Sequence, residues 1–248
     1  AFAQTPPTPA PLPSPAPGAP PPVLTEEESA WKAAMEQKQQ ANVVNEPKKG
    51  LDAAAAFIAF REKFPKSPHA REALVETGVC YMIAARAQQQ WHRNRPEGVA
   101  QFKTALEWFG KVASEAPDDA VLPRAIYCQG LVHVQLDDLA SAERAFTEVI
   151  EKHAADRLYF GKSLERRAAV RRHRLDTAGA KRDLDLYKTT FGAENTDPAK
   201  QTDEFKLVER FQNYLRAFDK PAPALRPETW PGGEAVALDK LKGEVVAL

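Results

Sequence analysis

The sequence predicts an all-α protein, a solenoid of helical hairpins with about four pairs and one capping helix. Glycine is scarce, with 12 residues in 248, and alanine is abundant, a balance that favours helices over turn-rich sheets. From Thr25 to Phe218, segments of roughly 12 to 20 residues carry apolar side chains at i, i+3, i+4 and i+7. Short polar or Pro- and Gly-containing breaks separate them. Small and aromatic residues also recur at fixed offsets, which is typical of a repeat protein.

The recurring residues define the repeat. One set recurs 52 positions later: Ala53, Phe57, Pro65, Ala73 and Gly78 become Ala105, Phe109, Pro117, Ala125 and Gly130. A second set recurs 38 positions later: Gly130, Ala142 and Phe146 become Ala168, Ala180 and Leu184. The unit is therefore about 37 or 38 residues long, and one copy is lengthened by about a dozen residues between Gln88 and Phe102.

These positions resemble the tetratricopeptide family, in which a small residue on the first helix of each pair faces a small residue and an aromatic on the second. Gly78 fits the first helix, and Ala105, Phe109 and Pro117 fit the second. Glycine or alanine lets two backbones approach closely while the aromatic ring fills the space beside them. The stretch FPKSPHAREALVETGVCY is particularly similar to tetratricopeptide proteins of the bacterial envelope. The resemblance covers about residues 25–192, although the first pair lacks a clear glycine and Gly192 stands where proline is usual.

The N-terminal residues 1–24 form a separate part. Ala1-Phe2-Ala3 matches the end of a cleaved secretory signal, which predicts an exported protein of the periplasm or cell envelope. Ten prolines lie between residues 4 and 22, and they exclude both helix and sheet. We expect a disordered, extended spacer, with a docking ligand for an aromatic groove as the less favoured alternative.

Three further parts follow along the chain. Order is expected to begin at Thr25, because Glu28 stands three positions on, at the spacing of a capping box. Residues 25–192 hold the repeats, and residues 193–219 hold a capping helix that covers the open end of the solenoid. Residues 220–248 are a Pro- and Gly-rich linker leading to a strand-like run, Val245-Val246-Ala247-Leu248.

The segment after Lys220 resembles the opening of thioredoxin-like proteins, where a Pro-Ala-Pro entrance leads to a hairpin and then to the first core strand. Residues at the matching positions include Pro221, Pro223, Gly233, Val236, Leu238, Leu241, Lys242, Gly243, Val245 and Val246. The resemblance implies that the complete protein is an envelope thiol-disulfide oxidoreductase whose redox cysteines follow Leu248. The alternative is a stand-alone periplasmic scaffold for envelope assembly without a redox domain, so enzyme activity stays open.

Candidate chemistry within the chain is sparse. Lys plus Arg equals Asp plus Glu, at 34 each, which predicts no nucleic-acid partner, and no apolar run is long enough to span a membrane. The five histidines and two cysteines have no metal-ligand spacing, and we expect no catalytic, metal or cofactor site. Cys80 and Cys128 are interpreted as buried core thiols, with a disulfide between them as the alternative.

Charged residues also cluster at several points in the sequence. Asp118-Asp119 and Asp137-Asp138 lie at turns, where helix capping explains them better than catalysis does. The basic run from Arg166 to Arg174 is interpreted as a solvated helix face rather than a site for phosphate or an acidic partner.

The tetratricopeptide resemblance implies that a protein or peptide binds the concave face lined by first helices. Six apolar residues are expected on this face: Val75, Val79, Met82, Tyr127, Leu131 and Val134. The Lys/Asn constellation by which some family members hold a C-terminal carboxylate is missing from the sequence. An apolar segment, extended or helical, is therefore the expected partner.

Overall fold

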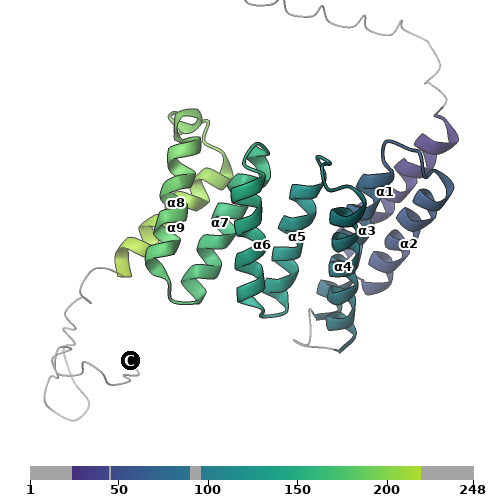
Figure 1. Cartoon of the computed structure of the whole chain (residues 1–248), viewed down its shortest axis with the longest axis horizontal. Coiled ribbons are helices and arrows are strands. Elements are labelled where there is room, and N and C mark those ends of the chain that lie inside the picture. The colour runs from purple at the N-terminus through teal and green to yellow at the C-terminus, as the bar shows by residue number, and fades with distance from the viewer. Residues whose placement is uncertain (1–23, 45, 90–95, 219–248) are drawn as a thin grey trace, which may run out of the picture.

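The computed structural model describes residues 24–44, 46–89 and 96–218, and within them it contains α-helices, one 3-10 helix and no strand. Figure 1 shows the helix pairs following one another along a row, from α1 and α2 at one end to α8 and α9 at the other. The elements are α1 (Glu26–Val44), α2 (Pro47–Lys63), α3 (Ala70–Gln89), α4 (Pro96–Glu115), α5 (Leu122–Gln135), α6 (Leu139–Lys152), α7 (Arg157–His173), α8 (Thr177–Phe191), η1 (Gly192–Asn195) and α9 (Asp203–Phe218). The expected strand and spacer, and the redoxin-like segment, lie outside the described residues.

Helix packing follows the repeat. Each helix contacts the next one along the chain, giving the pairs α1–α2, α3–α4, α5–α6 and α7–α8, with α9 packed on α8. The first helices of neighbouring pairs also contact one another, α1 with α3, α3 with α5 and α5 with α7. We call the surface that these first helices form the first-helix face. The predicted all-α repeat solenoid of four pairs with a capping helix is confirmed.

Close packing inside the central pairs explains the glycine and aromatic repeat. An added Cβ on Gly78 would lie 2.5 Å from the ring of Phe109, and one on Gly130 would lie 2.5 Å from the ring of Phe146. Both rings are completely buried. The glycine therefore provides the space that the ring of the same pair fills, and the aromatic core of each pair depends on it.

Side-chain caps set where the helices begin. The backbone N–H of Thr25 donates to Glu28 Oε2 at 2.8 Å, and the N–H of Glu28 donates to Thr25 Oγ1 at 3.2 Å, so the predicted capping box is present. Asp138 accepts from the N–H of Ser141 at 3.0 Å, and Asp176 accepts from the N–H of Gly179 at 2.8 Å. The capping interpretation of Asp138 is confirmed.

The turns within the last two pairs share one backbone conformation. Asp137 and Leu175, 38 positions apart, have φ of 60° and 65°, and each precedes the capping aspartate of the next helix. The repeat thus extends to the conformation of its turns. An aspartate also caps each helix of the fourth pair: Asp156 caps α7, which begins at Arg157, and Asp176 caps α8, which begins at Thr177.

The long repeat is accommodated by longer helices. Helices α3 and α4 have 20 residues each, whereas α5 and α6 have 14 each. Most of the extra length between Gln88 and Phe102 therefore makes both helices of the second pair longer than those of the third pair. Helix α3 of this longer pair contacts α1, and these two helices form one part of the first-helix face.

Candidate partner-binding face

The six residues expected on the first-helix face are more deeply placed than the sequence indicated. Val75, Met82 and Tyr127 are buried in the main core cluster, and Val79, Leu131 and Val134 are partly buried against it. Helix α3 contacts α1, α2, α4 and α5, so most of its circumference is covered. A buried helix that is apolar on several sides does not reveal from sequence which side faces a groove.

Two of the six, Val79 and Met82, line a groove between α1 and α3 with about 650 Å³ of space. We call it the α1–α3 groove. Its apolar walls also include Met35 and Ile83, so both methionines of the chain border it. The complete lining is Lys32, Met35, Glu36, Lys38, Gln39, Asn42, Val79, Met82, Ile83 and Arg86. A concave site of this volume with apolar walls and a few polar groups is suited to binding.

A buried carboxylate joins three first helices behind this groove. Glu76 of α3 accepts from Lys38 Nζ of α1 at 2.9 Å and from a guanidinium nitrogen of Arg124 of α5 at 2.7 Å. Its side chain is only 2% exposed, and the two cations offset the cost of burying its charge. No sequence pattern reveals this cross-link, because Lys38 and Arg124 lie 38 and 48 residues from Glu76.

A second hollow lies at the other end of the solenoid, between α7, α8, η1 and α9. Its volume is about 210 Å³, and its lining includes Tyr187, Phe191 and Val208. Leu158 and Leu207 also line it, with 57% and 43% of their surface exposed. We call it the α7–α9 hollow. Capping helix α9 therefore forms a wall of a potential binding site as well as covering the core.

The charged side chains that line the α7–α9 hollow are mostly acidic. Glu165, Glu194 and Glu204 line it together with Lys162. Burial raises the pKa of Glu165 above its ordinary value, and the charge of Arg166 opposes this shift. Three acidic groups beside one basic group contrast with the α1–α3 groove, where three basic groups stand beside one acidic group.

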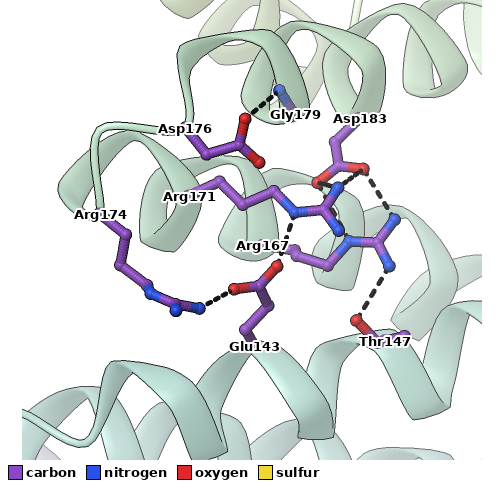
Figure 2. Close-up of polar contacts among 8 residues, drawn as sticks. All are labelled: Glu143, Thr147, Arg167, Arg171, Arg174, Asp176, Gly179 and Asp183. Atoms are coloured by element: carbon purple, nitrogen blue, oxygen red, sulfur yellow. Dashed lines mark hydrogen bonds and ion pairs between the residues drawn. The ribbon is translucent and has the colours of Figure 1, made fainter.

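The arginine run forms a polar brace between helices, which corrects the expectation of a solvated face. Figure 2 shows Arg167 and Arg171 of α7 converging on Asp183 of α8. Arg167 donates to both oxygens of Asp183, at 2.7 and 3.0 Å, and to Thr147 Oγ1 of α6 at 3.0 Å. Arg167 and Asp183 are both buried. Arg167 and Arg171 therefore hold α6, α7 and α8 together.

Glu143 of α6 completes the brace. It accepts from Arg171 Nε at 2.9 Å and pairs with Arg174 (Figure 2). Burial alone would raise the pKa of Glu143, but the hydrogen bonds and charges of Arg171 and Arg174 outweigh burial and hold the pKa below its ordinary value. The amphipathic pattern does not reveal the brace, because the brace depends on which helices become neighbours in the fold.

The two cysteines are free and buried, as expected for core thiols. Burial raises the pKa of Cys80 to about 12 and that of Cys128 to about 11. Such thiols are poor nucleophiles at neutral pH. No group of three potential metal ligands occurs among the described residues. In the same part of the chain, no helix has the length and apolarity needed to cross a membrane.

Comparison with known proteins gives distant structural likeness. No protein-family model matches the sequence, and no curated protein matches it. The crystal structure of BtubC (BKLC) from P. vanneervenii is similar over 86% of this chain and 100% of that one, at 14% identity and a TM-score of 0.36. A tetratricopeptide repeat protein from Parabacteroides merdae is similar over 79% and 82%, at 15% identity and a TM-score of 0.31. The fold described above rests on the packing of the helices themselves.

Proposed function

We propose that the chain is a repeat scaffold that binds a protein or peptide on its first-helix face. The observation that carries the proposal is that the α1–α3 groove and the α7–α9 hollow both lie beside first helices and both have apolar walls. In these places a partner can bury apolar side chains without rearranging the core. The helix pairs supply a rigid support for such a surface.

Selection from a random peptide library displayed on phage, with the full chain as bait, tests the proposal. Binders should be weakened by Arg86→Glu at the groove or by Leu207→Glu at the hollow, since each places a charge where it opposes docking. Matched controls are Arg182→Glu on α8 and Lys111→Glu on α4, both exposed and on second helices. Failure to select any binder, or binders sensitive only to the controls, would contradict the proposal.

A finer proposal concerns the complete protein. The redoxin-like motif from Pro221 to Val246 supports a scaffold that belongs to an envelope thiol-disulfide oxidoreductase, and Ala1-Phe2-Ala3 supports export. Since Cys80 and Cys128 are buried thiols of raised pKa, the redox pair would have to come from beyond Leu248. The gene should therefore encode a Trp-Cys-x-x-Cys-like motif within about 15 residues downstream of Leu248. A stop codon or further repeats there would favour the stand-alone scaffold.

A further inference from the structure

We infer that the α1–α3 groove binds a short amphipathic helix of another protein, with an apolar stripe flanked by acidic side chains. This inference rests on the proposed function and names the partner of one of its sites. It is carried by the shape of the groove, by the side chains on its floor and by the charges on its rim.

The shape of the groove fits a helix. Its lining runs from Lys32 to Asn42 on α1, roughly 15 Å at 1.5 Å per residue, and from Val79 to Arg86 on the neighbouring first helix α3. A helix of about ten residues matches this length. Two helices side by side present the ridges and grooves into which a third helix packs. The described part of the chain has no sheet edge to which an extended strand could add.

The floor of the groove is apolar and adaptable. Met35 and Val79 are partly exposed, and Met82 and Ile83 lie at the base. Methionine is unbranched and polarisable, and it adjusts its shape to the side chains that contact it. A stripe of leucine-sized side chains at i, i+3, i+4 and i+7 would cover this floor.

The rim of the groove selects the charge of the partner. Lys38 is already bound to the buried Glu76, which leaves Lys32 and Arg86 beside Glu36. Lys32 lies 3.9 Å from Glu36, a loose pair between two exposed side chains. Arg86 is exposed, and no carboxylate among the described residues pairs with it. The guanidinium of Arg86 is therefore available for a carboxylate of the partner.

The charged groups of the α7–α9 hollow differ from those of the α1–α3 groove, and this difference predicts which site an acidic helix prefers. In that hollow Glu165 is paired with Arg166 and Glu194 with Arg157, which leaves Glu204 beside Lys162. An acidic helix should therefore bind there less well than in the α1–α3 groove, where Arg86 has no paired carboxylate among the described residues. Two peptides with the same apolar stripe, one with acidic and one with basic flanking side chains, can therefore distinguish the two sites.

Two synthetic probes test the inference. Both are labelled amphipathic peptides of roughly 14 residues with leucine at i, i+3, i+4 and i+7, one with glutamate and one with lysine on the flanks. Fluorescence anisotropy with the full chain should show that the glutamate peptide binds at least ~10-fold more tightly than the lysine peptide, with affinity falling as salt is added. Equal binding of the two peptides, or no binding of the glutamate peptide, would overturn the inference.

Variants then locate the binding. Arg86→Glu should weaken the glutamate peptide by ~10-fold or more, and Glu36→Lys should strengthen it, whereas Arg182→Glu on α8 should leave it unchanged. These are exposed side chains, so folding is preserved and can be checked by circular dichroism. Loss of glutamate-peptide binding with Leu207→Glu, but not with Arg86→Glu, would overturn the inference while leaving the proposed function intact. The proposed function instead fails if no peptide can be selected at all.

Discussion

The contact between Gly130 and the ring of Phe146 makes a quantitative prediction. An added Cβ would lie 2.5 to 2.8 Å from three ring atoms, and the ring is fully buried, so it has little room to move. Gly130→Ala gains about 1 kcal/mol of helix propensity but costs about 1 to 3 kcal/mol by overpacking. Gly110 of α4 has nothing within 4 Å of the same position. Gly110→Ala therefore gains the propensity without the cost and serves as the matched control.

Thermal and urea unfolding followed by circular dichroism measure the difference. Gly130→Ala should be less stable than Gly110→Ala by about 1 to 3 kcal/mol, or roughly 2 to 12 °C in Tm for a domain of this size. Gly130→Leu should cost more, since its side chain extends further towards Phe146. If Gly130→Ala is as stable as Gly110→Ala, the close approach of α5 and α6 in the structure is wrong.

The fourth helix pair indicates which second substitution should restore the stability that Gly130→Ala loses. It has Ala168 and Leu184 at the positions of Gly130 and Phe146, and both residues are buried in one core cluster. The double variant Gly130→Ala with Phe146→Leu should therefore be more stable than the sum of its single variants, by a coupling of about 0.5 to 3 kcal/mol. Additive effects would show that the ring does not limit the space at Gly130.

Four further predictions concern other parts of the chain. Leu175→Asn should stabilise the protein by about 1 kcal/mol in urea unfolding, because Leu175 is 88% exposed and has a φ of 65° that asparagine tolerates better. The folded-state pKa of Glu143 lies below its ordinary value, so its contribution to stability is present above the ordinary pKa and is lost as the pH falls through the folded pKa. Glu143→Gln should weaken this acid dependence of unfolding, and an unchanged pH profile would argue against the brace. Cys80 and Cys128 should resist alkylation in the native protein and react after unfolding, whereas rapid native labelling would contradict their burial. Deleting residues 221–248 should leave helix content and Tm nearly unchanged, and unfolding of the helices would instead make the segment part of the solenoid.

The sequence predicts the repeat well because its signals are local or periodic. Thr25 and Glu28 are three residues apart, and the glycine and aromatic positions recur at fixed offsets, so each can be identified without knowing the fold. The lengthening near Gln88 was visible as an offset of 52 instead of 38, but its form as two extended helices was not.

The contacts that could not be predicted from the sequence depend on which helices become neighbours in the fold. Glu76 is joined to Lys38 and Arg124 across three helices, and no spacing rule connects residues so far apart. Arg167 looks like a surface residue in a basic run, yet Asp183 holds it inside the core. Val75 of the expected binding face is buried for the same reason, because its helix α3 contacts four other helices.

Hydrogen exchange on the full chain bound to its strongest selected peptide tests the central claim most directly. The partner is expected to cover the first-helix face, so amide exchange should slow in α1, α3, α5 and α7, and most at the α1–α3 groove when the peptide is acidic. Little change is expected in α2, α4 and α6, whereas the end of α8 lines the α7–α9 hollow and is protected if a peptide binds there. Protection confined to α2, α4 and α6 would contradict the assignment of the binding surface.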